Sequence, residues 1–61
     1  MELYNDLLTA IRTQPGLTIW NLQAKTQAER VADVYKELHA LRLVRSIERR
    51  WNQNRYQYYA L

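Results

Sequence analysis

The spacing of apolar residues changes once along this chain, just after Leu43, and that change limits the folds open to it. Before it, apolar residues recur at intervals of three and four, as they do on one face of a helix. After it, residues typical of strands lie on both sides of the polar segment Asn52-Gln53-Asn54, which suits a tight turn. The change predicts helices first and then a β-hairpin, with strands at about 44–51 and 55–61.

Three helices fit the first part of the chain, at about residues 2–13, 19–25 and 27–42. Pro15 ends the first helix, because proline lacks the N–H that a continuing helix needs. Thr18 is a suitable N-cap for the second helix, and Thr26 for the third, where Thr26-Gln27-Ala28-Glu29 matches a capping box. The third helix has an apolar stripe that is expected to face the core, formed by Val31, Val34, Tyr35, Leu38 and Leu41.

The chain has 61 residues and no cysteine, which predicts one domain, residues 1–61, held together by apolar packing. Tyr35 and Tyr59 are expected in its core. The other aromatic side chains cannot all be buried in so small a domain: Tyr4, Trp20, Trp51, Tyr56 and Tyr58. No apolar run approaches the ~20 residues of a membrane span, and the start does not resemble a signal peptide. A cytoplasmic protein with no membrane partner is therefore expected.

The order of helices, short turns and hairpin resembles that of the winged helix-turn-helix domains of bacterial MarR-, IclR- and PadR-like transcription regulators. Pro15-Gly16-Leu17-Thr18 stands where those domains enter their second helix, and Tyr58-Tyr59-Ala60-Leu61 fits the end of their last strand. Val31, Leu38 and Leu43-Val44 fit their third helix and the entry to the wing. Arg42 departs from the pattern, because the family usually has a left-handed glycine there. The resemblance implies an α+β winged helix, with three helices followed by a two-stranded β-hairpin wing.

In the resembling family the third helix enters the major groove of DNA, and the wing approaches phosphates or the minor groove. The resemblance therefore implies two groups of DNA-contacting residues. The group on the third helix is Gln27, Ala28, Arg30, Asp33 and Lys36. The group in the wing is Arg49, Arg50, Asn52, Asn54 and Arg55. Glutamine and arginine can form paired hydrogen bonds with base edges, and arginine also suits phosphate.

Charge is unevenly distributed along the chain, in agreement with that implication. Residues 42–61 hold five arginines and one acid, Glu48, whereas residues 1–41 hold four Lys and Arg and five acids. An arginine-rich wing favours double-stranded DNA as the partner. The predicted function is that of a sequence-specific transcriptional regulator. A homodimer is expected, because one such domain buries little surface on DNA.

The alternative is a protein-interaction module that uses exposed tryptophan and tyrosine side chains. Catalysis is not expected, because the sequence has no cysteine nucleophile, no Ser–His–carboxylate spacing and no glycine-rich phosphate loop. No cofactor is expected either, and the single histidine, His39, cannot form a metal site by itself.

Overall fold

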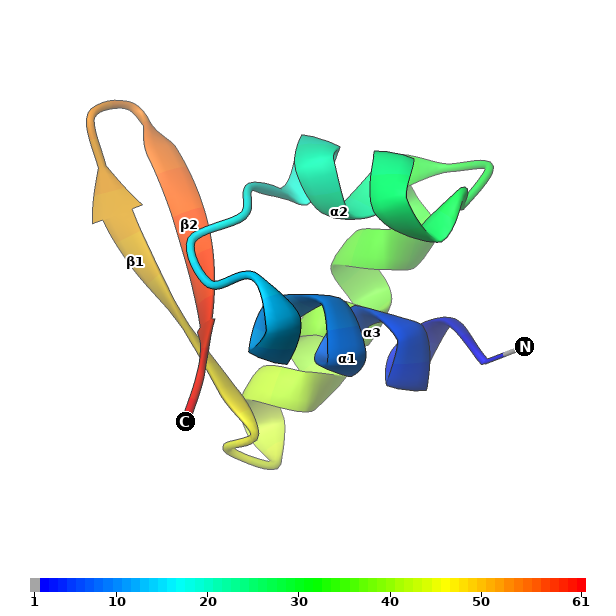
Figure 1. Cartoon of the computed structure of the whole chain (residues 1–61), viewed down its shortest axis with the longest axis horizontal. Coiled ribbons are helices and arrows are strands. Elements are labelled where there is room, and N and C mark those ends of the chain that lie inside the picture. Colours follow the sequence, from blue (N-terminus) through cyan, green and yellow to red (C-terminus); the bar gives the residue numbers. More distant parts are fainter. Residues whose placement is uncertain (1) are drawn as a thin grey trace.

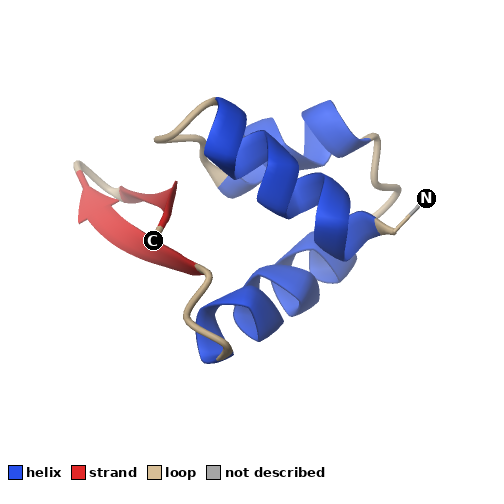
Figure 2. Cartoon of the chain, turned by 60° about the horizontal axis from the view of Figure 1, so that its bottom comes forward, coloured by secondary structure: helices blue, strands red, loops and turns tan. Residues whose placement is uncertain are grey.

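The computed structural model describes residues 2–61 and shows three helices followed by an antiparallel hairpin (Figure 1). The helices are α1 (Leu3–Thr13), α2 (Ile19–Thr26) and α3 (Val31–Leu43), and the strands are β1 (Ile47–Asn52) and β2 (Arg55–Ala60). The hairpin lies beside the helical bundle, at the opposite end of the molecule from the N-terminus (Figures 1 and 2). This layout confirms the predicted α+β winged-helix arrangement. Within residues 2–61, no helix is both long and apolar enough to cross a membrane.

The core lies where the three helices meet the base of the hairpin. Every helix and both strands contribute to it, as does the segment between α1 and α2. Its buried residues are Leu7, Ile11, Leu17, Leu22, Val34, Leu38, Leu41, Ile47 and Tyr58. In α3 the buried positions are three and four residues apart, as the helical spacing predicts.

The segment Gly16-Leu17-Thr18 joins the start of α2 to the hairpin. Gly16 has a φ of +91°, a conformation that residues with a Cβ rarely adopt. Its N–H donates to the Tyr58 carbonyl (2.9 Å), and the Tyr58 N–H donates to the Leu17 carbonyl (2.9 Å). Thr18 caps α2 as predicted: its hydroxyl accepts from the Asn21 N–H, and the Asn21 side chain accepts from the Thr18 N–H. The proline–glycine turn therefore fixes α2 against the wing.

The predicted start of α3 at residue 27 is wrong, and so is the N-cap role of Thr26. Thr26 is the last residue of α2, and its hydroxyl donates back to the Leu22 carbonyl at 2.7 Å. Gln27 then adopts the left-handed conformation, with its N–H directed to the Ala24 carbonyl and the Ala28 N–H to the Gln23 carbonyl. These two bonds form a Schellman motif, which ends a helix. As a result α3 begins only at Val31.

A second Schellman motif ends α3, and it corrects the prediction about Arg42. The left-handed residue is Arg45, not Arg42; the Arg45 N–H donates to the Arg42 carbonyl, and the Ser46 N–H to the Leu41 carbonyl. Arg42 stays within the helix. The chain needs residues 44–46 for this turn, so β1 starts at Ile47 instead of the predicted residue 44.

The hairpin turn contains two residues instead of the predicted three. Asn52 pairs with Arg55, and Gln53 and Asn54 between them have φ values of +49° and +74°. Positive φ at both positions is typical of the type I′ turn, whose twist matches that of paired strands. The register places Ile47, Arg49 and Trp51 on one face of the hairpin, together with their partners Ala60, Tyr58 and Tyr56.

That register corrects two expectations about tyrosines. Tyr58, not Tyr59, lies in the core, because it shares the helix-facing side of the hairpin with Ile47. Tyr35 is exposed, although it was expected in the apolar stripe of α3. Val31, from the same stripe, is half-buried. As predicted, several other aromatic side chains stay exposed: Trp20, Trp51 and Tyr56.

Candidate functional site

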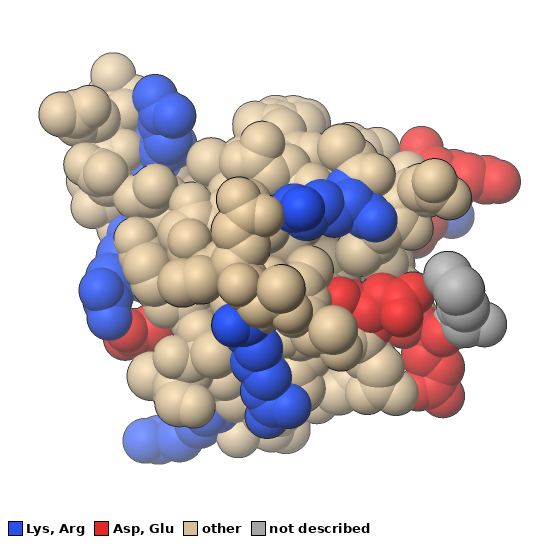
Figure 3. All heavy atoms as spheres, viewed as in Figure 1, with Lys and Arg blue, Asp and Glu red and all other residues tan. Residues whose placement is uncertain are grey.

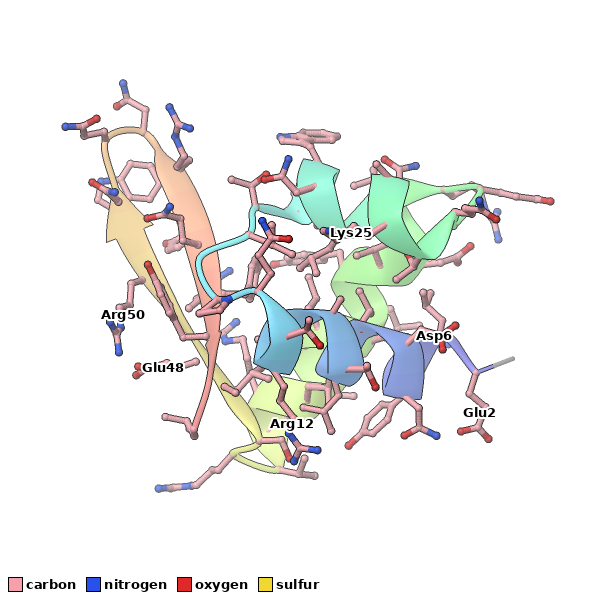
Figure 4. All side chains as sticks on the ribbon, viewed as in Figure 1. Glu2, Asp6, Arg12, Lys25, Glu48 and Arg50 are labelled. Carbon is pink, nitrogen blue, oxygen red and sulfur yellow. The ribbon has the colours of Figure 1, made fainter. Side chains whose placement is uncertain are left out.

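Acidic side chains gather at the end of the molecule away from the wing. Five of the six acids line two adjoining hollows between α1, the α2–α3 turn and α3: Glu2, Asp6, Glu29, Asp33 and Glu37. Figure 3 shows most of the visible red atoms at the end away from the wing and most of the blue ones elsewhere, and Figure 4 labels Glu2 and Asp6 at that end. This end would repel a polyanion.

The solvent-exposed face of α3 is free of acids. Ala32, Tyr35, Lys36 and His39 are exposed and follow one another at spacings of three and one, as on a single side of a helix. Asp33 and Glu37 instead lie on the flank that meets α1. Among the described residues of this exposed face, none is acidic, so the face can approach negative charge without repulsion.

A hollow of about 330 Å³ separates the wing from the helices. Five aromatic side chains line it, from three parts of the fold: Trp20 of α2, Tyr35 of α3, and Trp51, Tyr56 and Tyr58 of the wing. The wall is completed by Thr18 and Ile19 at the start of α2 and by the wing residues Arg49, Asn54 and Arg55. Of residues 2–61, no acidic side chain lines this hollow. We call it the aromatic–arginine hollow.

Arg49 contacts aromatic side chains that line the hollow. Its guanidinium carbon lies 4.0 Å from the centre of the Tyr56 ring, a cation–π contact. Trp51 meets the same ring edge-on, with the ring centres 5.0 Å apart. The pKa of Arg49 is raised: desolvation opposes the charged form, but the neighbouring side chains of Tyr58 and Tyr35 favour it. Arg49 is therefore a permanent positive charge between the wing and α3.

Arg50, the next residue, lies on the opposite side of the hairpin. Its Nε lies 3.0 Å from Glu48 Oε1, and its guanidinium also covers the Tyr59 ring at 4.2 Å. Figure 4 shows Arg50 and Glu48 pointing away from the helices. The structure therefore separates two arginines that the sequence placed in one group: Arg49 faces the helices, whereas Arg50 is paired with an acid on the outer face.

The residues predicted to lie on the third helix are dispersed. Gln27 and Ala28 lie in the turn before α3, because Gln27 terminates α2. Arg30 is the residue before the first turn of α3, and its Nε is 3.3 Å from Asp33 Oδ2. Lys36 alone of that group is on the exposed face of α3, at its edge, where it also lines the acidic hollow with Asp33 and Glu37.

The residues predicted in the wing are divided between its two faces and its tip. Arg49, Asn54 and Arg55 line the aromatic–arginine hollow. Asn52 instead uses its side-chain amide to donate to Gln57 Oε1 (2.9 Å), while Gln57 Nε2 donates to the Gly16 carbonyl (3.1 Å). Asn52 thus supports the wing–helix connection.

Sequence reasoning missed Tyr35 as part of a surface, since its spacing fits the core stripe. The sequence contained part of the signal for this role: Tyr35 and Asp33 are two residues apart, so they lie about 200° apart around the helix, on opposite flanks.

Within the described part of the chain, no group of three or more His, Asp or Glu residues is placed to hold a metal ion.

The chain matches no protein-family model, no curated protein and no solved structure.

Proposed function

We propose that this domain binds double-stranded DNA with the exposed face of α3 and the helix-facing side of the wing, as a transcriptional regulator in the cytoplasm. One observation carries the proposal: five of the six acids lie at one end of the molecule and the sixth, Glu48, is paired with Arg50, whereas the hollow between the wing and the helices is lined by Arg49 and by Arg55 near the wing tip, with no described acid. A domain of net charge +3 thereby presents a cationic surface to a polyanion.

The proposal changes which residues read the DNA sequence. Residues 27–30 precede α3, so base contacts fall to the exposed face of the helix itself. Lys36 and His39 can hydrogen-bond base edges, and Ala32 permits close approach of the backbone. Arg49 and Arg55 supply phosphate contacts, which position a protein on DNA without reading its sequence.

Fluorescence anisotropy with a labelled mixed-sequence duplex tests the proposal at two salt concentrations. Each neutralised phosphate releases counterions, so the affinity falls steeply as salt rises. Two or three phosphate contacts give a loss of about 12- to 40-fold between roughly 50 and 200 mM salt. Binding of a protein partner through apolar rings would instead keep its affinity at the higher salt concentration. No anisotropy change with duplex at low salt, or binding that is indifferent to salt, would contradict the proposal.

The predicted homodimer has a candidate surface at the base of the hairpin, opposite its turn. Leu43, Val44 and Leu61 are all exposed, and the Leu61 N–H donates to the Ser46 carbonyl, which brings the C-terminal residue beside the α3–β1 turn. We propose that a second copy covers these side chains, leaving both wings free for DNA. Sedimentation equilibrium of the wild type and of Val44→Glu tests this: the variant is expected to stay monomeric at concentrations where the wild type dimerises.

A further inference from the structure

Binding of a duplex leaves the most unusual feature of the surface unused. Trp20 is 66% exposed and Trp51 is 63% exposed, and both line the aromatic–arginine hollow together with Tyr35 and Tyr56. Phosphate contacts need arginine, not indole rings. Two tryptophan rings left in water forgo the free energy that burial of their apolar surface would give. Exposed apolar rings that lie together mark a contact surface. The rings therefore point to an occupant other than a phosphate group.

The wing rings are held in place before any ligand arrives. Tyr56 is engaged by the Arg49 guanidinium and by the edge of the Trp51 ring. Trp51 and Tyr56 also face each other across the hairpin, as partners in the strand register. Such paired aromatic rings on neighbouring strands stabilise each other. Trp51 is thus a fixed ring with most of its surface open to solvent.

The chemistry of the wall specifies the occupant. Open aromatic rings favour a ligand with a flat π-face, and Arg49 and Arg55 favour an anion. Asn54 adds a side chain that can hydrogen-bond the edge of a base. A nucleotide joins a π-face and an anion in one unit. The hollow, at about 330 Å³, lies at the small end of the range for ligand sites and suits a single base.

A base inside a duplex cannot fill this hollow, because both of its faces are stacked on neighbouring base pairs. An unpaired base, in contrast, can be unstacked and so offers a free face to an aromatic side chain. Tyr35 belongs both to the hollow and to the exposed face of α3, so a strand that leaves the duplex at α3 would reach the hollow directly.

We propose that the aromatic–arginine hollow binds an unpaired nucleotide of a single-stranded segment adjoining the duplex. This inference rests on the proposed DNA binding and adds a preference for junctions between double and single strands. Trp51 is the principal stacking ring, Arg55 contacts the backbone of the single strand, and Arg49 serves both the duplex and the hollow.

Anisotropy titrations with three labelled probes test the preference: a blunt duplex, the same duplex with a short oligothymidine extension, and the extension alone. The extension on either strand end is expected to tighten binding about 5- to 150-fold, which is what one base stacked on an aromatic side chain contributes. Trp51→Ala should remove this gain, so that the variant binds the blunt and the extended duplex with equal affinity. Trp51→Phe, which keeps an aromatic ring, should keep most of it.

Intrinsic fluorescence supplies a second measurement. In Trp20→Phe, Trp51 is the only tryptophan, and stacking by oligothymidine should quench its emission. Equal affinity for blunt and extended duplexes, without quenching, would overturn the inference while leaving duplex binding intact. Failure to bind any of the three probes would remove the proposed function as well. Quenching by an acidic, aromatic-rich peptide but not by oligothymidine would assign the hollow to a protein partner and overturn the inference.

Discussion

Arg49 and Arg50 provide a matched test of the proposal that DNA binds to the helix-facing side of the wing. They are adjacent, they carry the same charge, and they lie on opposite faces of β1. Arg49 lines the hollow beside α3, whereas Arg50 is bonded to Glu48 on the outer face. Replacing either with alanine lowers the net charge by one. A difference between the two variants therefore reports the position of the charge and not its amount.

The expected size of the effect follows from counterion release. Each phosphate contact adds about 0.9 to the slope of log affinity against log salt, so a fourfold rise in salt costs about 3.5-fold in affinity per contact. Arg49→Ala should lower the slope by about one unit, and Arg50→Ala by much less. The sequence placed Arg50 in one group with Arg49, and its pairing with Glu48 is the reason for the smaller value.

Anisotropy titrations at four or more salt concentrations measure both slopes. Arg49→Lys is the control for folding and packing, because it keeps the charge while losing the planar group over the Tyr56 ring. Thermal unfolding of all variants by circular dichroism checks that each is folded at the assay temperature. If Arg50→Ala lowers the slope as much as Arg49→Ala does, the helix-facing side of the wing is not the DNA-binding side, and the reasoning fails.

Three further predictions concern stability and are measured by urea unfolding. Leu38→Ala removes a side chain that is 1% exposed at the centre of α3 and should cost about 2–5 kcal/mol, enough to unfold much of the population; a loss below about 1 kcal/mol would mean the core is elsewhere. Thr18→Ala removes the cap of α2 and should cost about 0.5–2 kcal/mol, whereas Thr26→Ala, which loses no N-cap, should cost less; equal losses would restore Thr26 as a cap. Gln27→Gly relieves a left-handed φ of +57° and should stabilise the fold, while a substantial destabilisation would argue that residue 27 is helical.

The helical part of the fold was largely predictable because its signals are local. Pro15-Gly16 ends α1, Thr18 caps α2, and the spacing of Val34, Leu38 and Leu41 fixes the buried side of α3. Each of these depends on residues within one or two turns of the chain. The existence of the hairpin was predictable for the same reason. Its signals are a short polar turn, in which two residues adopt positive φ, and a run of β-type residues on each side of it.

The start of α3 was not predictable because two local signals compete there. Thr26 can cap a helix from outside or continue one from inside, and the sequence Thr-Gln-Ala-Glu fits the first role. Burial of Leu22 and the bond from Thr26 back to its carbonyl favour the second. Similarly, the burial of Tyr58 instead of Tyr59 follows from its pairing with Arg49 and Leu17, which are distant in sequence. Tertiary contacts decided both.

The candidate site depends on which elements of the fold lie on each side of α3. Asp33 and Glu37 are four residues apart and share the flank against α1, while Tyr35 lies on the other flank beside the wing. A sequence shows that these residues are on different sides of a helix, but not which neighbour lies on each side. In this fold α1 takes the acidic flank, and the wing lies beside the acid-free one. The same packing that buries Val34, Leu38 and Leu41 thus separates repulsive from attractive charge. The proposed DNA binding therefore predicts a wing-first approach, since the acidic end is repelled by a polyanion, and electrostatic orientation of this kind raises association rates at low salt.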